Sequence, residues 1–301
     1  MSEKTIILES GTLWTKVREQ TQKALELGAL QPILTDSEFI KQDDITFLVR
    51  IVSNLTRKDK AQKQSQDNKE FNPFLPYDED LFVCDISQTH LCLLNKYNVI
   101  DYHLLIVTRL FEEQDTWLTR QDFEALWATL AEIDGLAFYN GGKLAGASQR
   151  HKHLQLIPLP LAATEDKIPI SPVIASTIFE SDVIGKSPMF PFVHAIAQFN
   201  RDWLNSPVEA AEKSLHLYYQ LLKTVGLIED EIKSQKQTAP YNLLATREWM
   251  MIVPRSLDSF QSISVNSLGF AGALLARNSE QMQLIKELKP LTILQNVALN
   301  F

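Results

Sequence analysis

The chain has 301 residues, of which 45% are hydrophobic and 22% are charged, and its formal net charge at pH 7 is −8. This composition is typical of a globular protein with one large domain or two modest ones and a sizeable buried core. The acidic balance argues against a general nucleic-acid binder, which shows a basic face, but a few cations in a cleft could still attract an anionic small substrate.

The sequence contains no apolar run long enough to span a bilayer, and residues 1–7 lack the organisation of a signal peptide. We therefore expect a cytoplasmic protein without membrane association. Cys84 and Cys92 are the only two cysteines, which excludes a disulfide framework and a four-cysteine zinc site. They are predicted to be buried thiols in a reducing compartment rather than one disulfide.

The first half of the chain predicts a helix, a group of strands and a second helix. Apolar residues recur at helical spacing within the first thirty residues, and the second helix begins at Thr119, with Asp122 three residues later to complete a capping box. The strand-like segments are 44–52, 81–84, 89–94 and 103–107. The polar stretch 54–72 is predicted to be a surface loop, or alternatively a lid that carries basic residues over a phosphate.

The second half predicts a proline-rich crossing segment at 168–191, followed by an amphipathic helix at 207–224. A strand pair follows at 241–246 and 249–254, with its turn at Arg247 and Glu248. The stretch 266–277 is predicted to begin as a loop and to continue as a small-residue helix.

The segment 146–155 reads Gly-Ala-Ser-Gln-Arg-His-Lys-His-Leu-Gln. If it is a strand, His151, His153 and Gln155 share one face, because successive side chains point to opposite faces. Lys152 and Leu154 then share the other face with Leu156. Two imidazoles and an amide on one face predict a nucleophile with its supporting groups.

Histidine suits two-step group transfer, because a neutral imidazole nitrogen attacks phosphorus and can leave again. His153 is the predicted nucleophile, with its second ring nitrogen held as a donor, and His151 is predicted to orient it. Gln155 can donate an amide N–H to a phosphate oxygen but cannot act as a general acid. A third histidine at this position could act as a general acid and would favour hydrolysis by water. Glutamine instead favours transfer to an acceptor that brings its own phosphate.

The loop before this motif contains Gly141, Gly142 and Gly146, which can let backbone N–H groups converge on an anion. Alternatively, His-x-His could be half of a metal site. Zinc needs three or four ligands, however, and no clear ligand spacing relates His90, His103, His194 and His216. We therefore predict no metal site, and we interpret His103 as a core histidine with its hydrogen bonds satisfied.

Five further segments occur in the order found in one known family: 94–99, 138–142, 241–249, 253–256 and 266–272. Together with 146–155, they make the chain resemble the diadenosine tetraphosphate phosphorylases, also called ATP adenylyltransferases, over about residues 40–280. These enzymes belong to the transferase branch of the histidine-triad superfamily, in which glutamine replaces the last histidine.

The resemblance implies an α+β fold, with a histidine-triad/galactose-1-phosphate uridylyltransferase-like antiparallel sheet flanked by helices and two related halves. Residues 1–167 would form the catalytic half and 168–301 a half that contributes to the nucleotide site, either separately or as one continuous domain. The implied reaction is reversible phosphorolysis of diadenosine tetraphosphate by inorganic phosphate to ATP and ADP. His153 would form an adenylyl-histidine intermediate.

The resemblance also implies a set of substrate-binding residues. The positions that match the family are Asn95, Lys96, Asn140, Gly146, Ala147, Ser148, Gln149, Asn266, Ser267, Leu268, Ala273 and Arg277. Arg277 stands where the family commonly has lysine, which keeps the charge but changes its geometry. Ala273 equally fits close helix packing, and Arg50 is predicted as a further phosphate contact.

Other functions remain open on the sequence alone. These are another nucleotidyltransferase such as a hexose-1-phosphate uridylyltransferase, a dinucleotide hydrolase, and a nucleotide sensor without turnover. The expected partners are dinucleoside polyphosphates, ATP, ADP and phosphate, without nucleic acid. No tightly bound cofactor is expected, although Mg²⁺ could accompany the polyphosphate. The sequence does not predict the oligomeric state.

Overall fold

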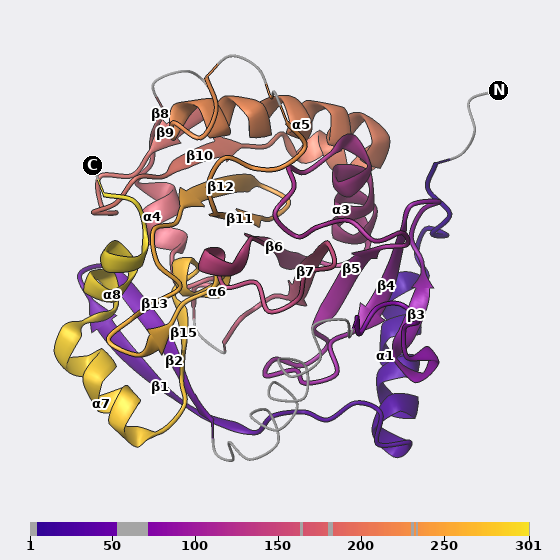
Figure 1. The fold of residues 1–301 in the computed structure, drawn as a ribbon, viewed down its shortest axis with the longest axis horizontal. Helices are drawn as coiled ribbons and strands as arrows, with labels where there is room; N and C mark the ends of the chain where they lie inside the picture. Colours follow the sequence, from indigo (N-terminus) through magenta and orange to yellow (C-terminus); the bar gives the residue numbers. More distant parts are fainter. Residues whose placement is uncertain are drawn as a thin grey trace.

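The computed structural model describes residues 5–52, 72–162, 165–179, 183–229, 232 and 234–300. Its centre is a ten-stranded sheet in which every neighbouring pair is antiparallel (Figure 1). In spatial order, its strands are β3 (Phe82–Asp85), β4 (His90–Leu94), β5 (Leu104–Thr108), β7 (His153–Pro158), β6 (Gly135–Gly141), β11 (Tyr241–Ala245), β12 (Trp249–Pro254), β10 (Ala195–Gln198), β9 (Ile184–Lys186) and β8 (Ile178–Phe179). Because β6 pairs with β11, one sheet runs through both halves of the chain.

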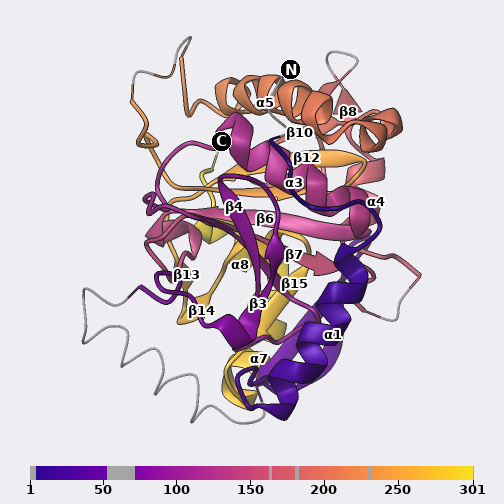
Figure 2. The same cartoon turned by 90° about the vertical axis from the view of Figure 1, so that its right-hand side faces the viewer.

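Three helices pack on one face of this sheet: α1 (Leu13–Glu26), α3 (Arg120–Glu132) and α5 (Pro207–Thr224). Figures 1 and 2 show α3 and α5 side by side, with α1 along β3. The predicted capping box of α3 is present, since Thr119 accepts from the Asp122 N–H and Asp122 accepts from the Thr119 N–H. Helix α5 has the predicted bounds, with a proline in its first turn.

The other face is covered over β6, β11 and β12 by a smaller sheet of β1 (Thr35–Gln42), β2 (Ile45–Val52) and β15 (Ala273–Ala276), together with α7 (Ser279–Leu288) and α8 (Pro290–Val297). In Figure 1 the indigo strands from the start of the chain lie beside yellow helices from its end. The parallel pairing of β2 with β15 joins these segments.

Short elements connect the main ones. They are η1 (Glu79–Leu81), η2 (Lys143–Ala145), α4 (Ser171–Ala175), η3 (Arg201–Asn205), β13 (Ser259–Phe260), β14 (Ile263–Ser264) and α6 (Ser267–Phe270). Cys84 and Cys92 are free, buried thiols opposite each other on β3 and β4. Within the described residues, no helix combines the length and apolar character needed to cross a membrane.

The predicted α+β class and its large antiparallel sheet are confirmed, as are the strand pair β11–β12 and the early helix α1. The prediction of a helix running to residue 277 is wrong, because α6 ends at Phe270 and residues 273–276 form strand β15. The predicted loop 54–72 lies outside the described residues, except for Asn72.

The alternation predicted for the motif strand is confirmed from its first residue. Leu154 and Leu156 of β7 pack in the core beneath the helices, whereas Ile157 packs in the core of the opposite face. His153 and Gln155 share the side of Ile157. The strand begins at His153, two residues later than the predicted pattern, and His151 instead forms an isolated bridge with Glu113.

Candidate active site

His153 stands at the first position of β7 and is 5% exposed. Its Nδ1 lies 2.8 Å from the carbonyl oxygen of His151. A carbonyl only accepts, so Nδ1 carries the proton and Nε2 keeps the lone pair. Burial outweighs this hydrogen bond and lowers the pKa of His153 to about 4. The imidazole is therefore neutral at pH 7, in the tautomer that a nucleophile needs.

His151 is held in the opposite tautomer. Its Nε2 donates to the carbonyl oxygen of Thr108 at 2.8 Å, so its Nδ1 accepts from the Asn72 amide at 3.0 Å. Burial lowers the pKa of His151 despite hydrogen bonds to backbone carbonyls that raise it. The Phe74 ring packs at 5.6 Å from the His151 ring and 5.3 Å from the His153 ring. The two imidazoles therefore lie on one side of the sheet with a shared aromatic contact.

Gln155 is oriented by a directed chain of hydrogen bonds, which we call the His103 network: Tyr97 N–H, Asn95, His103 and Gln155. The Tyr97 N–H donates to Asn95 Oδ1 at 3.3 Å, which leaves the Asn95 amide nitrogen to face His103 Nδ1 at 3.3 Å. His103 Nε2 then carries the proton and donates to Gln155 Oε1 at 2.9 Å. Because its oxygen is engaged, Gln155 presents its NH₂ group to a ligand.

Gln114 joins the start of β7 to the end of β6. Its Nε2 lies 3.0 Å from the carbonyl oxygen of Asn140 and 3.1 Å from that of His153, and its Oε1 accepts from the His153 N–H at 2.8 Å. This amide replaces ladder bonds beyond the last β6–β7 pair, Phe138 with Gln155. Gln114 thus fixes the backbone of the nucleophile and bridges the two strand ends.

Asn140 belongs to a second buried cluster, the Arg255 network: Arg255, Asn242, Asn140 and Ser267. Asn140 Oδ1 accepts from Asn242 Nδ2 at 3.0 Å, from the Ser267 N–H at 2.9 Å and from the Ser267 hydroxyl at 2.7 Å. Arg255 Nη1 in turn donates to Asn242 Oδ1 at 2.6 Å. With its oxygen fully engaged, the Asn140 amide has only N–H groups left to offer a ligand.

Arg255 is a buried cation, 4% exposed, with neutral hydrogen-bond partners. Its guanidinium donates to Asn242 and to several backbone carbonyls, among them Val297, Leu257 and Val265. No carboxylate of the described residues lies within ion-pair distance. Burial lowers the pKa of Arg255 to about 9, partly opposed by Asp258, so the group stays charged at pH 7. A cation behind Asn140 favours an anionic ligand.

The glycine loop contacts the second half of the chain directly. Gly146 has φ +91°, and a Cβ there would meet the Asn266 Cα at 2.9 Å. Glycine is therefore required both for its backbone conformation and for the close approach. The carbonyl of Ala145, one residue earlier, accepts from Asn242 Nδ2 at 2.8 Å. The loop predicted to hold phosphate thus rests on the Arg255 network.

Lys152 points to the helix side of the sheet and has no exposed surface. Its ammonium group lies 2.7 Å from Asp122 Oδ2, 2.9 Å from the Trp117 carbonyl and 3.3 Å from Glu112 Oε2. Burial alone would raise the pKa of Asp122, but Lys152 and the hydrogen bond from His90 outweigh it and lower that pKa. The motif is therefore anchored to the first turn of α3.

The other predicted residues occupy varied positions. Lys96 pairs with Asp78 at 3.5 Å, and Asn266 caps α6 by accepting from the Leu268 N–H at 3.0 Å. Ser148 and Arg277 are exposed, Ala147 and Gln149 are half-buried, and Ala273 lies opposite Leu48 in the small sheet. The structure does not bring Arg50 to His153, because Arg50 contacts Leu161 beyond the far end of β7.

The sequence did not single out Gln114 as a site residue, and it left His103 as a core histidine. His103 is indeed buried and hydrogen-bonded, but its partners are Asn95 and Gln155 of the motif. Asn242 and Arg255 lie in two of the segments that carried the resemblance, but the sequence analysis predicted no role for either residue. No group of three His, Cys, Asp or Glu side chains suited to a metal ion occurs among the described residues.

Comparisons with known proteins place the chain in a family. Residues 3–176 match the model of the Ap4A phosphorylase N-terminal domain, and residues 188–300 match that of the ATP adenylyltransferase C-terminal domain. The chain belongs to the Ap4A phosphorylase family. The resemblance predicted from the sequence motifs is therefore confirmed.

Two yeast relatives are similar along most of their length. The chain is 28% identical to diadenosine 5',5'''-P1,P4-tetraphosphate phosphorylase 2 of Saccharomyces cerevisiae over 303 residues, covering 90% of this chain and 89% of the relative. It is 25% identical to Protein APA1 of the same yeast over 290 residues, covering 90% and 88%.

Solved structures share the fold. Yeast Ap4A phosphorylase Apa2 in complex with Ap4A gives a TM-score of 0.79 at 21% identity, covering 97% of this chain and 99% of that one. The Apa2 structure without a named ligand gives 0.77 at 22% identity, covering 97% and 96%.

Proposed function

We propose that this chain catalyses the reversible phosphorolysis of Ap4A by inorganic phosphate to ATP and ADP. Family membership and the Ap4A complex of Apa2 support the substrate. The observation that carries the chemistry is the neutral His153, whose Nδ1 is locked by the His151 carbonyl and whose Nε2 keeps its lone pair.

The first step is attack of His153 Nε2 on an α-phosphorus. A P–N bond forms, the bond from that phosphorus to the bridging oxygen breaks, and ATP leaves with the bonding electrons. In the second step an oxygen of inorganic phosphate attacks the same phosphorus. The P–N bond breaks, the electron pair returns to Nε2, and ADP is released.

The surrounding amides stabilise the negative charge that develops on the phosphoryl oxygens. Gln155 supplies its NH₂ group, since His103 holds its oxygen, and Asn140 supplies N–H groups in the same way. Donors fixed before the reaction need no reorganisation in the transition state. A polyphosphate leaving group needs no proton at neutral pH, which fits a glutamine in place of a general acid. Mg²⁺ would arrive with the polyphosphate rather than in a protein site.

The test is to incubate the enzyme with Ap4A carrying radiolabel at the α-phosphorus, first without and then with phosphate. We expect an acid-labile, alkali-stable label on the wild type that phosphate discharges as labelled ADP. His153→Ala should take up no label, whereas His216→Ala, at an exposed histidine of α5, should label normally.

Two outcomes would contradict the proposal. Release of AMP by water alone would indicate a hydrolase, and binding of Ap4A without label or turnover would indicate a nucleotide sensor.

A further inference from the structure

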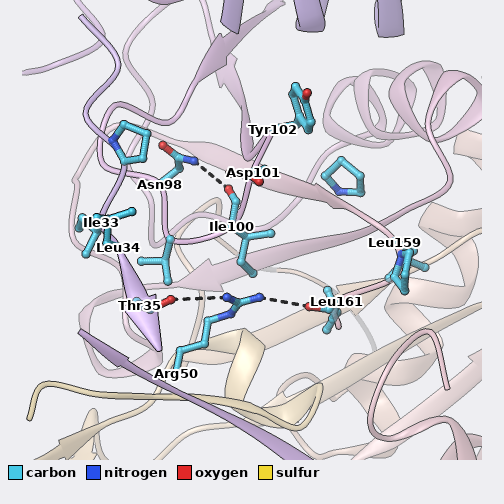
Figure 3. A pocket seen from close by; sticks show the side chains of 14 residues that line it. Ile33, Leu34, Thr35, Arg50, Asn98, Ile100, Asp101, Tyr102, Leu159 and Leu161 are labelled. Atoms are coloured by element: carbon cyan, nitrogen blue, oxygen red, sulfur yellow. Dashed lines mark hydrogen bonds between the residues drawn. The ribbon is translucent and has the colours of Figure 1, made fainter. Parts of the chain in front are cut away.

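A cavity of about 400 Å³ lies at the end of β7 remote from His153 (Figure 3). Its walls come from three segments, 32–35, 98–102 and 158–161, and from Arg50 of β2. His153 begins the six-residue strand β7, and the cavity begins where that strand ends. Since a strand rises about 3.3 Å per residue, roughly 20 Å separate this cavity from the nucleophile.

Two buried polar atoms of the cavity wall have no hydrogen-bond partner among the described residues: Arg50 Nε and Asn98 Oδ1. Asn98 is only 4% exposed, and its amide nitrogen is already engaged by the Ile100 carbonyl at 3.0 Å. Each such atom carries a desolvation cost of about 1–3 kcal/mol. One orphan donor and one orphan acceptor in one cavity match a ligand that offers both kinds of group.

The charged side chains that line the cavity are Arg50 and Asp101. Burial lowers the pKa of Arg50, and the charge of Asp101 partly opposes this effect. The case for an anionic ligand therefore rests on the hydrogen bonds of the guanidinium. Arg50 Nη2 donates to the Leu161 carbonyl at 3.2 Å and Nη1 to the Thr35 hydroxyl at 3.5 Å, and both partners are neutral (Figure 3). No carboxylate of the described residues lies within 4.0 Å of this guanidinium. A guanidinium with neutral partners and a spare N–H is suited to an oxyanion.

Apolar side chains form one part of the wall, and Ile33, Ile100 and Leu159 are labelled among them in Figure 3. Thr35, Asp101 and Tyr102 make the remainder of the lining more polar. Leu34, at 76% exposed, is a further lining residue open to solvent. This apolar part of the wall can pack against a hydrocarbon or an aromatic ring of a ligand.

We propose that this cavity binds a small organic oxyanion: a phosphate or carboxylate on Arg50, a ring against the apolar wall and an N–H or O–H donor on Asn98.

A ligand in this cavity can affect the catalytic face, which is the side of the sheet that carries His153 and Gln155. The connection is the loop 98–102. The residues that flank this loop are Asn95 and His103, which orient Gln155, and their backbones are joined by the bond from the Asn95 N–H to the His103 carbonyl at 2.9 Å. Tyr102, next to His103, holds a positive φ of 56° and packs on Trp14. A ligand that shifts this loop therefore changes the position of the Gln155 amide.

The binding test uses calorimetry on the wild-type chain with AMP present at saturation, so that the nucleotide site is filled. The probes are 4-aminophenyl phosphate and 4-aminobenzoate, which distinguish the two oxyanions, and aniline, which lacks one. We expect one equivalent of an anionic probe to bind and aniline not to bind. Arg50→Gln should weaken binding by about 10-fold or more, since a charge-assisted pair is lost.

Lys41→Gln is the matched control, because it removes one positive charge from an exposed position of the same small sheet. It should bind the probe as the wild type does. Arg50→Lys keeps the charge without the planar fork and should give an intermediate affinity, and thermal unfolding checks that each variant is folded. The proposed site would be contradicted if the anionic probe did not bind, if AMP competed with it, or if Arg50→Gln bound it as tightly as the wild type.

The kinetic arm measures Ap4A phosphorolysis with and without the bound probe. We expect kcat to change by about fivefold in the wild type and not in Arg50→Gln, because weak coupling between sites is typically of this size. Binding without any kinetic change would overturn the coupling to Gln155. The binding arm requires no turnover, so its result is independent of the proposed reaction.

Discussion

The His103 network and the Arg255 network each present an amide NH₂ group on the catalytic face, but they hold it differently. Gln155 is held by one bond to His103, at the end of a chain of single neutral hydrogen bonds. Asn140 is held by three donors, and the network behind it contains a buried cation. The comparison indicates that the orientation of Gln155 depends on a single hydrogen bond, whereas Asn140 is part of what keeps the two halves of the chain together.

The largest expected effect comes from breaking the Arg255 network. Arg255→Met should lower the free energy of unfolding by about 3–5 kcal/mol, because Asn242 and several backbone carbonyls lose their donor while buried. Urea denaturation would measure it. Arg201→Met, which removes an exposed arginine paired with Glu248, should stay within about 0.5 kcal/mol. Equal stability of the two variants would show that the buried guanidinium is not structural.

A smaller effect, on turnover rather than stability, is expected from the His103 network. His103→Leu removes the donor that holds Gln155 Oε1, so kcat should fall by about 10- to 100-fold as the amide loses its orientation. The unfolding free energy should change by only about 1 kcal/mol. His103→Gln restores an N–H donor and should recover part of kcat with little change in KM. An unchanged kcat in His103→Leu would contradict the orienting role.

The smallest expected effect is a pH dependence that comes from His153, the nucleophile between the two networks. A lowered pKa means that His153 binds a proton only at more acidic pH, so kcat/KM should persist below pH 6 and fall near pH 4. The unfolded chain takes up this proton near the ordinary value of 6.5, so the contribution of His153 to stability should decrease as pH falls from 6.5 to about 4. Comparing the pH dependence of unfolding of wild type and His153→Ala measures this. An acid limb near pH 6.5 assigned to His153 would contradict the burial argument.

The sequence predicted features that neighbouring residues determine. Helix α5, the Thr119 capping box and the alternating faces of β7 follow from spacing along the chain. Strand β15 was predicted as helix because its Ala and Leu residues favour helices, and only pairing with β2, far away in sequence, makes it a strand.

The residues of the site show the same distinction between local and long-range features. His153 and Gln155 were found because they stand in one short motif. Gln114 and Arg255 act through tertiary contacts with carbonyls and amides, and no local pattern indicates such partners. His103 was assigned to the core because it stands in a predicted apolar strand. Its role depends on a hydrogen bond to Gln155 of the neighbouring strand β7, which no local pattern indicates.

The placement of Lys152 has a consequence for engineering. The residue between the two histidines is neutralised by Asp122, which also accepts from Thr119 at the start of α3. A designer who transplants the ten-residue motif into another scaffold would bring along a lysine with no counterion beneath the sheet. The smallest transferable unit is therefore the strand together with the first turn of its helix.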